Sequence, residues 1–251
     1  MEANSISVLA QCFFEFLGTF VMILLGCGVV ACTTLKSSKG YGAGWVVITL
    51  AWGLAVMCGV FIAGPFTGAH LNPAVTLGLA FANKFCWSLV VPYIISQLLG
   101  AYLAGVVVYY FYKDHFDATD DKEAKLGVFA TIPAIKNLQR NFFSEVVGTF
   151  VLILVILFLS ESSNVAEVGL GSIGAFPVAM LVVVIGMALG GTTGYAINPA
   201  RDLGPRLAHQ SLPIKGKGDS HWDYAMVPIL GPICGAALAV AVYYIYLALV
   251  A

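Results

Sequence analysis

The chain has 251 residues, of which 60% are hydrophobic and 10% are charged, and its mean hydropathy is +0.92. Soluble domains carry about 25% charged residues, so this chain has too few to cover a solvated surface. Its net charge of -1 offers no basic face to a nucleic acid. The composition therefore predicts an integral membrane protein in contact with the lipid bilayer, with no nucleic-acid partner.

Long stretches without Asp, Glu, Lys or Arg run along the chain, at residues 16–35, 40–83, 85–112, 146–160, 168–200 and 224–251. About 20 apolar residues cross a bilayer as a helix, so these stretches predict six spanning helices. We place them at residues 7–34, 42–63, 85–112, 141–160, 172–192 and 223–250. Two of the stretches, with 44 and 33 residues, are longer than one span needs.

A polar segment at residues 113–140 holds ten of the 25 charged side chains and is predicted to be a connecting loop. It separates a first repeat at 7–112 from a second repeat at 141–250, within a single transmembrane domain over residues 1–251. Residues 15–24 match 145–154 at an offset of 130, and residues 64–78 match 190–204 at an offset of 126. Leu99-Gly100 matches Leu230-Gly231 at an offset of 131. Because each half has three spans, an odd number, the second copy is predicted to be inverted in the membrane.

Each of the two longest uncharged stretches contains one Asn-Pro-Ala, at Asn72-Pro73-Ala74 and at Asn198-Pro199-Ala200. Asn is a favoured N-cap and Pro a favoured first helical residue, which predicts helices at 73–81 and 199–208. Helices of this length rise only about 14 Å and cannot cross a bilayer. A single Asn-Pro-Ala is more often an ordinary helix start. Two copies at matching places in an inverted repeat instead predict re-entrant half-helices that meet near the midplane.

The meeting point of the half-helices has a predictable chemistry. Each Asn side-chain oxygen caps its own helix, which leaves the NH2 group free to donate into the lumen. The two helix N-termini create a positive potential that is unfavourable to cations and to an excess proton. The residues that precede them are predicted to present backbone carbonyls to the lumen, at Gly68, Ala69, His70, Leu71, Gly194, Ala196 and Ile197.

Together these motifs resemble the aquaporin superfamily and, within it, the aquaglyceroporins or glycerol facilitators. The likeness is particularly strong at residues 68–76, 194–206 and 227–232. It implies an all-α membrane protein with six transmembrane helices and two re-entrant half-helices in an inverted repeat, the right-handed bundle of the aquaporins. The family is also homotetrameric, with one pore in each subunit. Its members lie in the plasma membrane with both termini in the cytoplasm.

In this family four residues form an outer constriction that sets selectivity, and they map onto Trp52, Gly186, Tyr195 and Arg201. Arg201 would supply a buried cation with several N–H donors. Trp52 and Tyr195 would form an aromatic corner for a carbon backbone, and Gly186 leaves room that a bulkier His fills in a water-selective relative. Taken singly, Trp52 suits membrane packing and Gly186 suits helix packing, so only the joint spacing favours a filter.

Glycerol facilitators usually have Phe where this chain has Tyr195, and its hydroxyl would narrow the slot or add a polar contact. The order in which glycerol, water and other small solutes permeate therefore stays open. Asp202, directly after Arg201, resembles the aspartate that aquaglyceroporins carry where water channels commonly have a small residue. It is expected to pack the half-helix against the outer loop. The side chain of His70 is an alternative pH sensor, although its carbonyl is the expected pore element.

Glu15 and Glu145 occupy matching places in the two repeats. Membrane carboxylates carry protons or ions in some transporters. In the resembled family they instead accept hydrogen bonds from the backbone of the re-entrant loops, and we favour that structural role.

The function predicted is a passive channel for glycerol and similar small uncharged solutes, with some water permeability, that excludes ions and protons. The alternatives are a water-selective channel and, from another class, a secondary transporter coupled through Glu15 or Glu145. No constellation indicates an enzyme, a cofactor or a metal site. The positive-inside rule opposes the family orientation, because Lys84 alone lies on the expected cytoplasmic side. Ten basic residues lie on the other side: Lys36, Lys39, Lys113, Lys122, Lys125, Lys136, Arg140, Arg206, Lys215 and Lys217.

Overall fold

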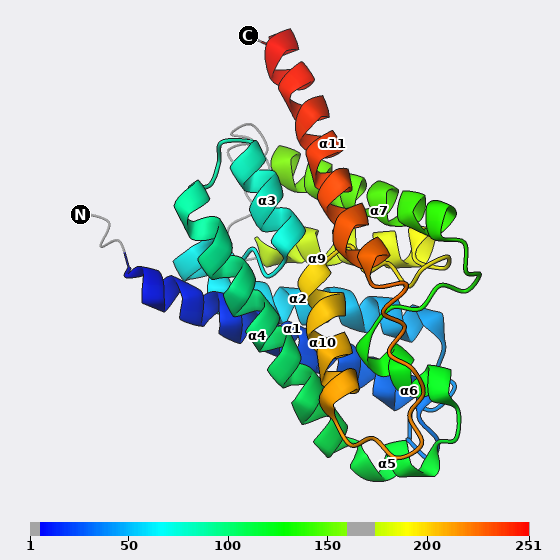
Figure 1. Cartoon of the computed structure of the whole chain (residues 1–251). Coiled ribbons are helices and arrows are strands. Elements are labelled where there is room, and N and C mark those ends of the chain that lie inside the picture. Colours follow the sequence, from blue (N-terminus) through cyan, green and yellow to red (C-terminus); the bar gives the residue numbers. More distant parts are fainter. Residues whose placement is uncertain (1–5, 160–173, 251) are drawn as a thin grey trace.

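The structure, a computed structural model, describes residues 6–159 and 174–250, which form helices and connecting loops (Figure 1). Among the described residues, five helices are long and apolar enough to cross a membrane: α1 (Val8–Thr34), α2 (Trp45–Thr67), α4 (Trp87–Phe111), α7 (Leu138–Leu159) and α11 (Met226–Val250). A shorter apolar helix, α9 (Ala175–Leu189), corresponds to the remaining predicted span. The half-helices are α3 (Pro73–Phe81) and α10 (Pro199–Ser211). The predicted all-α membrane fold is confirmed.

The polar segment between the halves is more ordered than a loop. It contains α5 (Lys113–Ala118) and α6 (Lys122–Phe129), which the sequence analysis did not predict. Asp121 begins α6 as an N-cap, because its carboxylate accepts hydrogen bonds from the backbone N–H groups of Glu123 and Ala124. These short helices bring the end of α6 against α1 and α10.

The packing of the helices follows the internal repeat. In the first half α1 packs against α2 and α4, and in the second half α7 packs against α9 and α11. Each half-helix also packs against the last helix of the opposite half, α3 against α11 and α10 against α4 (Figure 1). The two halves are therefore interlocked by their half-helices rather than joined along a flat interface.

Two glycines show how closely the repeats correspond. A Cβ atom added at Gly100 would lie 2.4 Å from the carbonyl oxygen of Phe16, and one added at Gly235 would lie 2.4 Å from that of Val146. Phe16 and Val146 are repeat equivalents, so Gly100 corresponds to Gly235 in the packing. The predicted match of Gly100 with Gly231 is therefore wrong by one helical turn. The sequence pattern misled because glycines recur one turn apart on α11.

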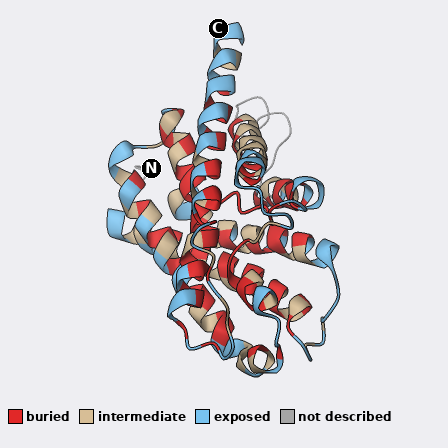
Figure 2. Ribbon diagram, turned by 45° about the vertical axis from the view of Figure 1, so that its right-hand side comes forward, coloured by how far each residue is buried: buried red, intermediate tan, exposed pale blue. Residues whose placement is uncertain are grey.

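Burial follows the pattern expected for a bundle in lipid. Buried residues line the inner faces of the helices, and the outer faces are exposed (Figure 2). Those outer faces carry large apolar side chains, among them Val46, Leu50, Leu99 and Ile245. Contiguous apolar surface of this kind is stable against hydrocarbon or another subunit.

Candidate pore and its re-entrant loops

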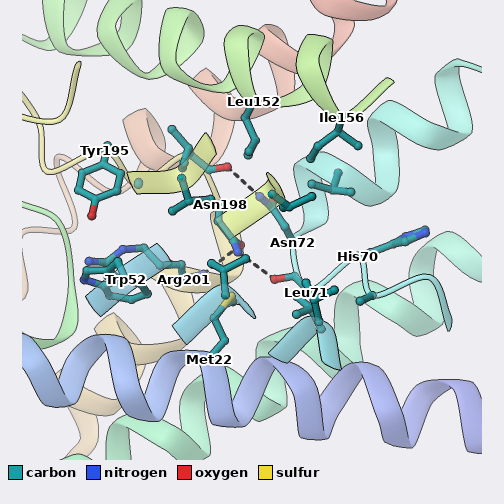
Figure 3. A pocket seen from close by; sticks show the side chains of 18 of the residues that line it. Met22, Trp52, His70, Leu71, Asn72, Leu152, Ile156, Tyr195, Asn198 and Arg201 are labelled. Carbon is teal, nitrogen blue, oxygen red and sulfur yellow. Dashed lines mark hydrogen bonds between the residues drawn. The ribbon is translucent and has the colours of Figure 1, made fainter. Parts of the chain in front are cut away.

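The two asparagines cap their half-helices as predicted. The side-chain oxygen of Asn72 accepts a hydrogen bond from Ala74 N at 2.8 Å, and that of Asn198 accepts from Ala200 N at 3.0 Å. Their NH2 groups, however, are not wholly free. Asn72 Nδ2 donates to the carbonyl of Ile197 at 2.9 Å, and Asn198 Nδ2 donates to that of Leu71 at 2.8 Å (Figure 3). An NH2 group has two N–H donors, so each asparagine keeps one that is not used in this exchange.

The segments before the half-helices have an unusual backbone. Ala69 and Leu71 have positive φ angles of 51° and 53°, and their repeat equivalents Tyr195 and Ile197 have φ angles of 38° and 42°. Left-handed conformations cost about 1–2 kcal/mol each for residues with a Cβ atom. They persist only where the surroundings fix them, as they often do at functional sites. The repeat therefore extends to the strained backbone of both loops.

Glu15 fixes the first loop. Its carboxylate accepts hydrogen bonds from His70 N at 2.9 Å and from Leu71 N at 2.8 Å. The side chains of Thr67 and Gln97 donate to the same carboxylate at 2.7 Å and 2.8 Å. Glu15 is fully buried.

Glu145 fixes the second loop in the same way. It accepts from Thr193 Oγ1 at 2.7 Å, from Ala196 N at 3.0 Å and from Ile197 N at 2.8 Å. Its side chain is also buried. Because both carboxylates are occupied by loop donors and neither lines the cavity, the geometry favours bracing over ion transport.

A cavity of about 150 Å³ lies between the two loops. One water needs about 10–15 Å³, so the cavity has room for a small solute or several waters. Figure 3 shows Asn72 and Asn198 at its centre, His70 toward one end and Arg201 with Trp52 and Tyr195 toward the other. Most of the remaining wall is apolar, with Val56, Val60, Val75, Leu79, Leu152, Ile156, Val178 and Val182. The cavity is therefore polar along the loops and apolar opposite them.

Three of the four predicted filter residues line this cavity. The guanidinium carbon of Arg201 lies 4.1 Å from the ring centroid of Trp52, within the range of a cation–π contact. Arg201 Nη1 also donates to the carbonyl of Phe129 at 3.3 Å. Gly186 stands behind Tyr195, since a Cβ added to it would lie 2.6 Å from Cζ of that ring. Trp52, Tyr195 and Arg201 thus border one end of the cavity, and Gly186 contacts this group from behind the Tyr195 ring.

A buried ion pair beside this end was not predicted. Arg206 Nε donates to Asp202 Oδ1 at 2.7 Å, and both side chains are fully buried. Asp202 also accepts from Thr131 N at 2.8 Å, and Arg206 donates to the carbonyl of Thr131 at 3.0 Å. From the sequence, Arg206 is counted among the ten basic residues on one side of the membrane, but α10 carries its side chain into the bundle, where it is fully buried. Its spacing of four residues from Asp202 was the signal that could have identified the pair.

Asp202 links the half-helix α10 to Thr131, in the segment between the two halves of the chain. The segment that it holds at Thr131 also contains Phe129, whose carbonyl contacts Arg201. The Asp202 and Arg206 pair therefore supports Arg201 indirectly, through residues 129–131.

Lys217 caps the C-terminal end of α10. The ammonium of Lys217 donates to the carbonyls of His209, Gln210 and Leu212, each at 2.7 Å. His209 and Gln210 lie in the last turn of α10, where a helix leaves carbonyls without partners, and a cation there also complements the helix dipole. Partial burial lowers the pKa of the Lys217 ammonium.

His70 reaches toward the opposite end of the cavity from Arg201 (Figure 3). Its ring is buried, with Nδ1 3.1 Å from Thr76 Oγ1 and its centroid 4.4 Å from that of Phe85. The ring therefore packs beside the loop while its backbone N–H is held by Glu15.

Comparison with known proteins agrees with this geometry. Residues 2–243 match the family model described as major intrinsic protein. The chain belongs to the major intrinsic protein family.

Several relatives within the family are similar over nearly their whole length. Glycerol uptake facilitator protein 3 of Lactiplantibacillus plantarum is 53% identical over 229 residues, which cover 91% of this chain and 93% of the relative. The glycerol uptake facilitator protein of Streptococcus pneumoniae is 49% identical over 236 residues, covering 94% and 99%. Among solved structures, the aquaglyceroporin from Plasmodium falciparum superposes with a TM-score of 0.80 at 33% identity, covering 94% of this chain and 96% of that one.

We expect Glu145→Gln to lower the apparent melting temperature by about 3–10 °C. The amide would turn a donor toward the loop N–H groups, and a hydrogen bond to a charged group is worth about 1.5–3 kcal/mol. Thermal unfolding in detergent measures the change. Asp114→Asn, the same exchange on an exposed residue, is the control. Equal melting temperatures for Glu145→Gln and the unmodified protein would contradict a bracing role.

We expect Arg206→Met to destabilise the protein more strongly, by about 3–5 kcal/mol, because it leaves the Asp202 carboxylate buried and unpaired. A double variant that also carries Asp202→Leu should recover part of the loss, since replacing a whole buried pair is often neutral. The same melting experiment tests both, with the exposed Arg140→Met as the control. A double variant less stable than Arg206→Met alone would rule out this account of the pair.

Proposed function

We propose that this protein is a passive, uncoupled channel for glycerol and similar small uncharged solutes, with some water permeability, and that it excludes ions and protons. The observation that carries the proposal is the constriction at which the Arg201 guanidinium, the Trp52 ring and the Tyr195 ring border one cavity. By rotation about its C–C bonds, glycerol can turn its hydroxyls toward one side of the carbon backbone and present C–H groups on the other. This constriction offers N–H donors on one side and aromatic surface on the other.

The middle of the cavity continues the same division of polar and apolar surface. We propose that the carbonyls of residues 68–71, 196 and 197, which line the cavity, accept hydrogen bonds from solute hydroxyls, and that Asn72 and Asn198 donate to those hydroxyls. Gly194, which was predicted to belong to the same set, is not among the lining residues. A carbonyl oxygen has two lone pairs, so those of Leu71 and Ile197 keep one after accepting from the opposite asparagine. The facing apolar wall offers no competing polar partner.

Exclusion of cations follows from the fixed charges. Arg201 carries a positive charge beside the lumen, and α3 and α10 direct their positive N-terminal ends toward the middle of the cavity. Donors from Asn72 and Asn198 orient a central water as an acceptor from both sides, which interrupts a continuous chain for proton transfer. An uncharged solute meets neither barrier.

For the assembly and its place in the cell, we propose a homotetramer in the plasma membrane, with one pore in each subunit and both termini in the cytoplasm. The family resemblance and the large apolar outer faces support this arrangement. The burial of Arg206 beside Asp202 removes one of the basic side chains that argue for the opposite orientation.

Proteoliposomes that contain the protein should shrink in an impermeant osmolyte and reswell rapidly in glycerol, with a low activation energy. Stopped-flow light scattering measures both phases, and vesicles without protein are the control. Rapid shrinkage without glycerol reswelling would instead identify a water-selective channel. If glycerol accumulates against its own concentration gradient, and only when an ion gradient is present, the protein is a coupled transporter. That result would contradict the proposal.

Gly186→Ala should lower glycerol flux by about 5-fold or more, because the overlap with Tyr195 corresponds to overpacking worth at least about 1 kcal/mol. The larger Gly186→His should abolish glycerol reswelling. Gly28→Ala is the matched control, since an added Cβ at this helical glycine would meet no atom within 4 Å. Unchanged glycerol flux in both Gly186 variants would remove this residue from the filter.

A further inference from the structure

The ring of Tyr195 is confined on one side by the backbone of α9. A Cβ added at Gly186 would lie 2.6 Å from Cζ and 2.9 Å from the hydroxyl oxygen of Tyr195. One added at Gly190, a single turn further along, would lie 2.5 Å from Cδ1 of the same ring. The backbone at these two glycines therefore packs directly against the ring, from Cδ1 to the hydroxyl. We call Gly186 and Gly190 the cradle of the ring. The ring also lines the cavity.

Packing rather than hydrogen bonding holds this ring. The Tyr195 hydroxyl is buried and has no hydrogen-bond partner among the residues that the structure describes. The backbone, by contrast, is fixed on both sides of Tyr195. Gly194 N donates to Gly190 O at 2.9 Å, and Ala196 N donates to Glu145. What remains adjustable is the side-chain torsion that tilts the ring toward or away from the cavity.

Trp45, at the start of α2, packs against the Tyr195 ring. Its ring centroid lies 5.7 Å from that of Tyr195 with an interplanar angle of 79°, an edge-to-face contact. Its indole Nε1 donates to the carbonyl of Gly186 at 3.0 Å. The Cβ that would collide with Tyr195 at Gly190 would also lie 2.9 Å from Cζ2 of Trp45. One side chain therefore contacts the filter ring and is anchored to the cradle behind it.

We infer that Trp45 is a specificity-determining positioning residue, which holds the Tyr195 ring at the constriction and so sets the largest solute that passes. Trp45 does not line the cavity and acts through Tyr195. Loss of its indole lets the ring tilt out of the lumen, which widens the slot. Larger polyols then gain flux relative to glycerol. This inference rests on the proposed glycerol channel and adds a residue outside the predicted filter.

The test compares the flux of a linear five-carbon polyol with that of glycerol in the same proteoliposomes. In Trp45→Ala we expect the ratio of the two fluxes to rise by about two- to tenfold, the range set by the energy of one edge-to-face aromatic pair. Trp45→Phe keeps an aromatic contact and should restore most of the original ratio. If Trp45→Ala cannot be recovered folded, Trp45→Leu tests the same loss of an aromatic face.

A double variant separates positioning from general stability. On a Tyr195→Ala background, Trp45→Ala should leave the flux ratio unchanged, because the ring on which it acts is gone. The control is Trp222→Ala. Trp222 is 39% exposed, as is Trp45, its indole also donates a hydrogen bond, and neither indole lines the cavity. Among the described residues, however, Tyr195 has its ring contact with Trp45 and not with Trp222.

The outcomes that overturn the inference differ from those that overturn the proposed function. An unchanged ratio in Trp45→Ala, or an equal rise on the Tyr195→Ala background, in a protein that conducts glycerol would refute the role of Trp45 alone. Absence of glycerol flux in the unmodified protein would refute the proposed function and this inference with it.

Discussion

Two buried carboxylates determine whether this molecule can hold irregular backbone inside a membrane. In each re-entrant loop two N–H groups point to a carboxylate rather than to a helix carbonyl, those of His70 and Leu71 in the first and of Ala196 and Ile197 in the second. In hydrocarbon an unpaired N–H group costs several kcal/mol. The carboxylates of Glu15 and Glu145 accept hydrogen bonds from those N–H groups, and the loops in turn supply the donors that a buried carboxylate needs. Neither partner is stable at this depth without the other. The left-handed residues of both loops depend on the same interaction.

The exchange between the asparagines joins these two braced loops into one unit. Asn72 caps α3 and reaches the loop before α10, and Asn198 caps α10 and reaches the loop before α3. Each half-helix also packs on the last helix of the opposite half. Local capping and long-range packing therefore favour the same arrangement, a consistency that is expected of a sequence with one stable fold.

The internal symmetry ends at the Arg201 end of the cavity. At an offset of 126, Arg201, Asp202 and Arg206 correspond to Val75, Thr76 and Ala80. Only the second half-helix therefore carries fixed charge. The opposite charges of Asp202 and Arg206 neutralise each other, while Arg201 faces the cavity beside Trp52. The uncharged equivalents Val75, Thr76 and Ala80 place no fixed charge at the other half-helix, so the charge beside the cavity lies at the Arg201 end.

Secondary structure that depends on interactions within one helical turn could be predicted from the sequence alone. Asn72-Pro73 and Asn198-Pro199 begin α3 and α10 where predicted, because a cap and a fixed proline φ act within one turn. Long uncharged runs likewise located the spans. Only the tertiary structure decided which carbonyl each asparagine contacts, that Gly100 corresponds to Gly235, and that Trp45 stands against Tyr195. These contacts join residues far apart in the chain, and their geometry depends on how the helices cross, which neither periodicity nor composition specifies.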